Sequence, residues 1–247
     1  MNSASLSAAK QQLRSLVRSN LAHVTPESIA SQSRNVFDRL KSLKPFEEAE
    51  RISIFLSMPS GEIQTDAIVR HALAVGKQVF IPYLHKSPFA PGEGPPRVMD
   101  MVRLRDLEDY ESLQPDKWGI PSIDPATVNE RQRILGGSDP ASADSSSTLD
   151  LILMPGVAFD IDPETGLLRR LGHGKGFYDF FIERYRKKTK PPGHPDARPV
   201  LLYGLGLAEQ FLTPDSGTSV PVGPHDKSLH GVVLGNGQVK GPSDSST

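Results

Sequence analysis

The stretch Leu151-Ile-Leu-Met-Pro-Gly-Val-Ala-Phe-Asp160, followed by Leu168-Arg-Arg-Leu-Gly-His-Gly-Lys-Gly-Phe-Tyr-Asp179, decides the fold class. Its first part is an apolar run of strand length, and its second part is a glycine-rich loop. The loop opens an aromatic-rich helix that we expect near residues 175–188. A buried strand that leads into a glycine loop and a helix is typical of α/β proteins with a parallel sheet.

Apolar strands and helices also alternate on either side of this stretch. Residues 51–57 and 77–82 have the composition of strands, and the helix expected between them, at 66–75, starts after Thr65 and ends at Gly76. Further strands are predicted at 98–103, 149–154, 199–203 and 231–234, and further helices at 5–20, 26–43 and 207–212. The sequence therefore predicts an α/β fold with a largely parallel sheet and helices on both faces.

The length and composition limit the classes of protein. A chain of 247 residues fits one α/β domain, and 28 basic against 29 acidic residues give no overall field for nucleic acid or an acidic membrane. The absence of cysteine excludes disulfides, cysteine-bound metal and thiol catalysis. No apolar run approaches the roughly 20 residues that a membrane-spanning helix needs.

We expect the single domain to span residues 1–234, with a disordered tail at 235–247. Three segments interrupt the apolar pattern and are predicted to be surface loops, because they have too little apolar surface to offset the entropy of ordering. These loop insertions lie near 87–96, 136–148 and 187–198.

The first 26 residues allow two interpretations. They contain Lys10, Arg14 and Arg18 and no acid before Glu27, which is also the pattern of an organellar transit peptide. The alternative is an amphipathic helix that carries Lys10 and Arg14 four residues apart on one side. We favour the helix and expect a cytoplasmic protein, with a mitochondrial location left open.

The glycine-rich loop has the features of a phosphate site. Glycine lets backbone N–H groups approach a ligand closely, and the helix N-terminus adds partial positive charge. Lys175 is followed by Gly176 rather than by Ser or Thr, so the loop is no P-loop, and its glycine spacing does not match a dinucleotide fingerprint. Four cationic or titratable side chains cluster here: Arg169, Arg170, His173 and Lys175.

Five separated motifs together resemble the 5-formyltetrahydrofolate cyclo-ligase family, also called 5,10-methenyltetrahydrofolate synthetases. The resemblance extends over about residues 5–234 and implies an α/β fold like that of ribose-5-phosphate isomerases and coenzyme A transferases. The motifs are Lys10-x-x-x-Arg14, Ile54-Phe-Leu-Ser-Met58 with Glu62-Ile, Trp118-Gly-Ile-Pro121, Met154-Pro-Gly-x-x-Phe-Asp160 and Arg170-Leu-Gly-His-Gly-Lys-Gly-Phe-Tyr-Asp179.

The resemblance also implies roles for individual residues, with Lys175 and Arg170 as the catalytic groups. ATP would be bound by Lys10, Arg14, Arg170, Leu171, Gly172, His173, Gly174, Lys175, Gly176, Phe177 and Tyr178. The folate would be bound by Met58, Glu62, Trp118, His173, Gly174, Lys175, Gly176 and Phe177. Mg²⁺ would be bound by Asp179 and Asp226.

Purely structural roles for the same residues are the alternative. Lys10 and Arg14 also suit a solvated helix face, and Asp179 also suits the first turn of a helix, where a carboxylate is stabilising. The sequence departs from the family pattern at His173, where many relatives carry arginine, and at His230, where they carry aspartate.

The implied activity is the ATP- and Mg²⁺-dependent closure of 5-formyltetrahydrofolate to 5,10-methenyltetrahydrofolate, with release of ADP and phosphate. We expect Mg-ATP and the folate as ligands, no nucleic acid or membrane partner, and a monomer. Two alternatives are a small-molecule kinase and a non-catalytic binding protein. Glu62 and the Lys10/Arg14 pair favour the cyclo-ligase over the kinase, and Lys175, Asp179 and Asp226 argue against a protein without catalysis.

Overall fold

The computed structural model describes residues 3–90, 92–136, 148–189 and 199–241. In this part of the chain no helix is long and apolar enough to span a membrane. The helices are α1 (Ser3–Leu21), α2 (Pro26–Lys41), α3 (Lys44–Glu48), α4 (Asp66–Ala74), α5 (Leu107–Glu111) and α6 (Phe177–Thr189). The strands are β1 (Arg51–Ile54), β2 (Gln78–Lys86), β3 (Arg97–Arg103), β4 (Gln114–Pro115), β5 (Pro121–Ser122), β6 (Leu151–Pro155), β7 (Ala158–Ile161), β8 (Leu168–Leu171), β9 (Leu201–Gly206), β10 (Gly231–Leu234) and β11 (Val239–Lys240).

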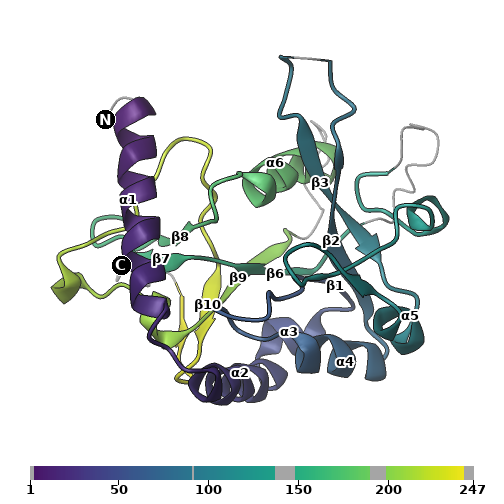
Figure 1. Cartoon of the computed structure of the whole chain (residues 1–247), viewed down its shortest axis with the longest axis horizontal. Helices are drawn as coiled ribbons and strands as arrows, with labels where there is room; N and C mark the ends of the chain where they lie inside the picture. Colours follow the sequence, from purple (N-terminus) through teal and green to yellow (C-terminus); the bar gives the residue numbers. More distant parts are fainter. Residues whose placement is uncertain (1–2, 91, 137–147, 190–198, 242–247) are drawn as a thin grey trace.

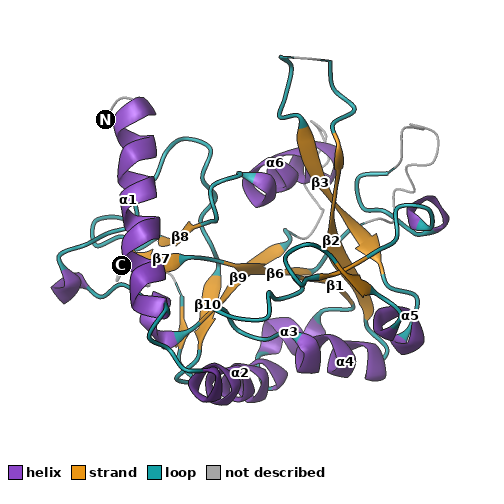
Figure 2. Cartoon of the chain, viewed as in Figure 1, coloured by secondary structure: helices purple, strands orange, loops and turns teal. Residues whose placement is uncertain are grey.

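A seven-stranded sheet in the order β11-β10-β9-β6-β1-β2-β3 forms the centre of the molecule (Figures 1 and 2). The five strands from β10 to β2 run parallel, whereas β3 and β11 pair antiparallel with their neighbours at the two edges. The predicted α/β class with a largely parallel sheet is therefore confirmed.

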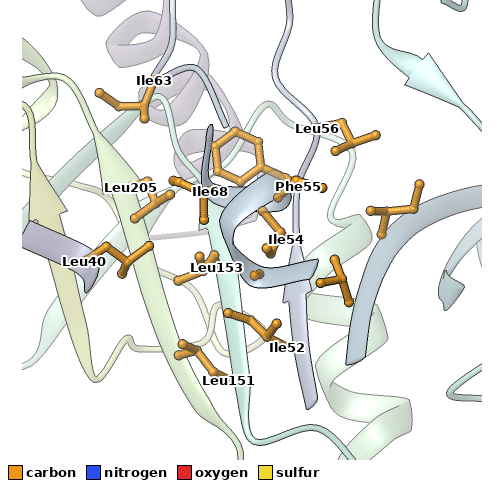
Figure 3. Close-up of a cluster of buried hydrophobic side chains, with 14 of the residues drawn as sticks. Leu40, Ile52, Ile54, Phe55, Leu56, Ile63, Ile68, Leu151, Leu153 and Leu205 are labelled. Carbon is orange, nitrogen blue, oxygen red and sulfur yellow. The ribbon is translucent and has the colours of Figure 1, made fainter. Parts of the chain in front are cut away.

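Successive side chains of the central strands enter two separate cores, because neighbouring residues of a strand point to opposite faces. On one face, Ile52, Ile54, Leu151 and Leu153 pack with residues of α2 and α4 (Figure 3). On the other face, the intervening side chains pack with Phe181 of α6. Figure 1 shows α2, α3 and α4 along one side of the sheet and α6 on the other, as predicted.

Helix α1 packs into the fold rather than extending from it. Its apolar face buries Leu13 and Val17 against a cluster formed by Val157, Ala158, Leu171 and Val220. Residues 3–21 therefore form an amphipathic helix that packs on the folded domain.

Three sequence predictions differ from the structure. Residues 235–241 are not a disordered tail, because Asn236 and Gly237 turn the chain and β11 pairs with β10. Gly237 has φ +80°, which glycine adopts without strain, and Asn-Gly is a known hairpin signal. The loop expected at 187–198 begins later, because α6 continues to Thr189. The helix expected at 207–212 is only a 3₁₀ turn at Ala208–Gln210.

Other parts of these predictions lie outside the described residues. They are residues 137–147 and 190–198 of two predicted loops and residues 242–247 of the predicted tail. The loop predicted at 87–96 joins β2 to β3, and only residue 91 of it is not described.

Candidate active site

The glycine-rich loop joins β8 to α6, so it lies at the N-terminus of a 13-residue helix. The antiparallel pair β7 and β8 leads the chain from the end of β6 to this position. Gly174 and Gly176 have φ values of +104° and +66°, in a region of backbone conformation that residues other than glycine rarely adopt. A Cβ atom on Gly174 would also lie 3.3 Å from Cζ of Arg14. The loop therefore requires glycine for its backbone and for its close approach to α1.

Helix α1 brings both basic residues of the N-terminal motif to this loop. Nε of Arg14 donates a hydrogen bond to the Gly172 carbonyl at 2.8 Å. One turn earlier, Nζ of Lys10 contacts Oδ1 of Asp226 at 2.7 Å and Oδ2 at 2.5 Å. The spacing of four residues thus places two cations beside the loop, which a solvated helix face would not do.

Arg170 is buried beneath the loop, with its side chain 4% exposed. Its Nη1 donates to the Pro155 carbonyl at 3.1 Å, and its Nη2 contacts Oδ2 of Asp179 at 3.2 Å. The guanidinium also lies 5.4 Å from the ring centre of Tyr178, whose buried hydroxyl has no hydrogen-bond partner in the described chain. Burial raises the pKa of Tyr178.

Arg169, which the sequence grouped with the phosphate-binding cations, is committed elsewhere. Its guanidinium pairs with Asp160 at 2.5 Å and with Asp162 at 3.0 Å. Asp160 is 3% exposed and also accepts the Val220 backbone N–H at 2.8 Å. Arg169 therefore joins β8 to β7, and Asp160 joins β7 to the segment that leads to Asp226. The role of Arg169 is structural.

Lys175 is the cation of the loop that remains available. Its side chain is exposed, and no hydrogen bond or ion pair holds it within the described residues. An ammonium group without a partner beside a helix N-terminus is suited to a phosphoryl group.

A cavity of about 500 Å³ adjoins the loop, close to the size of small-molecule sites in other proteins. It contains the predicted residues Met58, Glu62 and His173 and one cation that the sequence did not single out, Arg18. The sequence did contain a signal for Arg18, because it follows Arg14 by four residues and therefore lies on the same face of the helix. The remaining lining residues are Leu21, Ala22, Val24, Pro26, Ile29, Ser60, Gly61, Gly156, Val157 and Gln210.

Glu62 is the carboxylate of this cavity and is 6% exposed. Its Oε1 accepts the Met58 backbone N–H at 2.6 Å. Burial raises the pKa of Glu62 to about 7, and the Met58 hydrogen bond opposes this rise only in part. Desolvation and the nearby guanidiniums of Arg18, Arg170 and Arg14 lower the pKa of His173, so this histidine is largely neutral at pH 7.

Of the predicted folate-binding residues, only Met58, Glu62 and His173 line this cavity, whereas Trp118, Gly174, Lys175, Gly176 and Phe177 do not. Trp118 is 55% exposed on the surface, with Nζ of Lys117 4.2 Å from its ring centre. Leu171 buries its side chain in the α1 core cluster, and its carbonyl accepts the Val157 N–H. Phe177 and Tyr178 begin α6 and are half-buried at its first turn.

The two aspartates predicted to bind a metal both lie beside the loop, but their oxygens already accept hydrogen bonds. Oδ1 of Asp179 accepts the Lys227 N–H at 3.1 Å, and Oδ2 of Asp226 accepts the Gly223 N–H at 2.6 Å, in addition to the Arg170 and Lys10 contacts. Within the described residues no three acidic or histidine side chains form a metal-binding group. Both carboxylates are thus paired with basic side chains and backbone N–H groups in this structure.

His230, which departs from the aspartate expected from the resemblance, makes a backbone contact in this structure. Its Nδ1 accepts the Leu202 backbone N–H at 2.9 Å, which ties the start of β10 to β9. Burial lowers the pKa of His230, and the charge of Arg186 lowers it further.

The model of the 5-formyltetrahydrofolate cyclo-ligase family matches residues 6–235. The chain belongs to this family. A probable 5-formyltetrahydrofolate cyclo-ligase of Caenorhabditis elegans is 35% identical over 224 residues, 91% of each chain. The 5-formyltetrahydrofolate cyclo-ligase of Mus musculus is 30% identical over 234 residues, 94% of this chain and 97% of its own. The solved 5,10-methenyltetrahydrofolate synthetase of Aquifex aeolicus has the same fold, with a TM-score of 0.62 at 22% identity over 96% of this chain and 95% of its own.

Members of the family, this chain included, are ATP-dependent ligases that convert 5-formyltetrahydrofolate to 5,10-methenyltetrahydrofolate. ATP and a reduced folate are therefore its ligands. The residues that hold each ligand follow from the geometry above only as proposals.

The raised pKa of Glu62 leads to a prediction about stability. A carboxyl group whose pKa is higher in the folded than in the unfolded chain makes unfolding easier as pH rises between the two values. Glu62→Gln keeps an acceptor for the Met58 N–H but carries no charge. The variant should therefore gain stability over the parent between about pH 4.5 and pH 7, reaching about 3 kcal/mol above pH 7.

Urea unfolding of both proteins at pH 5 and pH 8 measures this difference. Glu47→Gln, at an exposed position of α3, is the matched control and should show no such change with pH. An equal stability difference at the two pH values would show that Glu62 is ionised in the empty site.

Proposed function

We propose that the reaction begins with transfer of the γ-phosphoryl group of ATP to the formyl oxygen of the folate. This step breaks the bond between the β- and γ-phosphates, releases ADP and leaves an iminium phosphate. N10 then attacks the activated carbon and loses its proton, and the C–O bond breaks to release phosphate. Expulsion of phosphate is far easier than expulsion of hydroxide, which explains the need for ATP.

A protein that performs this reaction needs positioning and charge compensation rather than a nucleophile of its own. The absence of cysteine is no obstacle. The observation that carries the proposal is that α1 contacts both the glycine-rich loop and the segment before β10. Lys10 of α1 pairs with Asp226, and Arg14 donates a hydrogen bond to the Gly172 carbonyl.

We assign the triphosphate to the side of the loop that faces α1. Lys10 and Arg14 are the cations that contact it from the helix, and the backbone N–H groups of residues 172–176 contact it from the loop. Arg170 supports the loop from below through Pro155 and also supplies positive charge. Lys175, whose side chain makes no hydrogen bond or ion pair with the described residues, stabilises the transferring phosphoryl group.

Mg²⁺ fits this arrangement as a partner of ATP rather than as a resident ion, since it commonly takes one or two carboxylates and fills its other positions with phosphate oxygens and water. It supplies neutralisation of the phosphate charge. Asp179 and Asp226 are the carboxylates that would face it. Arrival of phosphate gives Lys10 and Arg170 another anion to contact, which frees the oxygens they now occupy.

We assign the pterin to the cavity beside the loop. Glu62 accepts hydrogen bonds from the amino-pyrimidine edge, which a carboxylate does with good orientation and affinity. Met58 contributes apolar surface on one wall, and His173 stands between the cavity and the phosphate loop. The neutral state favoured for His173 leaves the phosphate charge to the lysines and arginines.

A spectroscopic assay tests the activity itself. Purified protein with 5-formyltetrahydrofolate, ATP and Mg²⁺ should produce the conjugated methenyl compound, followed by its near-ultraviolet absorption, with one ADP for each product molecule. Omission of either ATP or Mg²⁺ should abolish it. ADP release without the methenyl product would indicate a kinase instead, and no reaction by folded protein would reject the assignment.

We also propose that the protein acts as a monomer in the cytoplasm. Leu13 and Val17 of α1 pack into the domain, which favours a structural role for this helix, and a mitochondrial location is the alternative. Size-exclusion chromatography and fractionation of the source cells test the two parts separately.

A further inference from the structure

Helix α1 carries a third cation in line with the two that reach the phosphate loop. Lys10, Arg14 and Arg18 follow one another at intervals of four residues, so they lie along one face of the helix, about 6 Å apart along its axis. Lys10 is paired with Asp226 and Arg14 with the Gly172 carbonyl. The exposed side chain of Arg18 has no hydrogen bond or ion pair within the described part of the chain.

Arg18 lines the cavity that also contains Glu62, but the two charges come from different segments. Arg18 belongs to α1, whereas Glu62 belongs to the loop after β1, and no ion pair joins them. Between these charges the cavity is largely apolar, with Leu21, Val24 and Ile29 among its lining residues. The cavity thus offers a buried carboxylate, an apolar region and an exposed guanidinium at its rim.

The folate substrate has the complementary sequence of groups. Its pterin carries hydrogen-bond donors on the pyrimidine edge, its aminobenzoyl ring is apolar, and its far end is a glutamate with free carboxylates. When the pyrimidine donors bind Glu62, the glutamate carboxylates of the folate lie toward the rim of the cavity, where a cation would bind them. A guanidinium binds a carboxylate through two parallel hydrogen bonds.

We propose that Arg18 binds a carboxylate of the glutamate tail of the folate, a role that rests on the pterin assignment made above. ATP is the less suitable partner for this arginine. Arg18 lies one turn beyond Arg14, on the side away from Lys10 and Asp226, and it lines the same cavity as the apolar side chains of Leu21, Val24 and Ile29.

The experiment compares 5-formyltetrahydrofolate with 5-formyltetrahydropteroate, which lacks the glutamate. Arg18→Gln should raise KM for the complete folate about three- to tenfold, the range between an exposed ion pair and a charge-assisted hydrogen bond. KM for the pteroate, KM for ATP and kcat should stay unchanged. Arg18→Lys should restore KM only in part, since an ammonium keeps the charge and loses the paired hydrogen bonds.

Arg34→Gln is the control of equal charge, because Arg34 is an exposed arginine of α2 that does not line the cavity. This variant should leave kcat and the KM values for the folate, the pteroate and ATP at the parent values. An equal rise of KM for the folate and the pteroate would overturn the proposal, and so would a rise confined to ATP. Failure of the parent protein to form product from either compound would reject the pterin assignment and the activity rather than Arg18 alone.

Discussion

Replacement of Lys175 by alanine is expected to lower kcat by about 10²- to 10³-fold, the usual effect of removing one group that stabilises charge in a transition state. The stability of the fold should hardly change, because the side chain is exposed and makes no hydrogen bond or ion pair with the described residues. KM for the folate should stay near the parent value, since Lys175 is assigned to the transferring phosphoryl group. Steady-state kinetics and a thermal melt measure both effects.

Lys187→Ala provides the control for this variant. Lys187 lies on α6, the helix that follows the loop of Lys175, is 75% exposed and pairs with Glu183 at 2.9 Å. Its loss should reduce stability by only about 0.3–0.5 kcal/mol and leave kcat unaltered. A Lys175→Ala enzyme with near-normal turnover would remove Lys175 from the mechanism and leave the backbone of the loop as the main stabilising element.

The second large effect concerns the Mg²⁺ requirement of Asp179→Asn. If Asp179 faces Mg²⁺ carried by ATP, the amide lacks the charge that the cation needs. The concentration of Mg²⁺ for half-maximal rate should then rise by at least about tenfold, in the range seen when groups around a metal are changed. The amide oxygen still accepts the Lys227 N–H, but the buried Arg170 guanidinium loses its ion pair, so the melting temperature should fall as well and is measured beside the Mg²⁺ titration.

The ion pair with Arg170 offers another explanation that the same titration separates. If Asp179 only positions Arg170, KM for ATP should rise while the Mg²⁺ titration keeps its parental midpoint. Asp226→Asn, which loses the Lys10 pair, is tested in parallel. Two ligands of one ion should give combined losses smaller than the sum of the single ones. Additive losses in the double variant would place the two aspartates in separate roles.

The fold class was predictable because its signals are local. Apolar runs of strand length and helices with a polar side recur along the chain, and Thr25 followed by Pro26 marks the start of α2, where the Thr25 hydroxyl accepts the Ser28 N–H. The features that the sequence pattern missed are short or antiparallel. The β7–β8 pair has only four residues in each strand, and β11 has two, too few for a period to be recognised.

The glycine-rich loop and the cations near it could be located from the sequence, but the contacts that these residues make could not. The glycine loop and Lys175 follow from residue types and spacing. The residue types and spacing also grouped Arg169 with the phosphate-binding cations, and they assigned no site role to Arg18. Two arginines in adjacent positions of β8 point to opposite faces, so Arg170 goes under the loop while Arg169 meets Asp160.

The sequence by itself determined the longer helices and the central parallel strands, the positions of the glycines in the loop and which family the motifs resemble, because these depend on neighbouring residues. Only the tertiary structure decided which charges meet: Lys10 and Asp226 are 216 residues apart, and Arg14 and Gly172 are 158 apart. It also decided that Glu62 is buried, which raises its pKa to about 7. Burial and pairing depend on chain segments brought together by the packing of α1 and the sheet, and no local pattern records that packing.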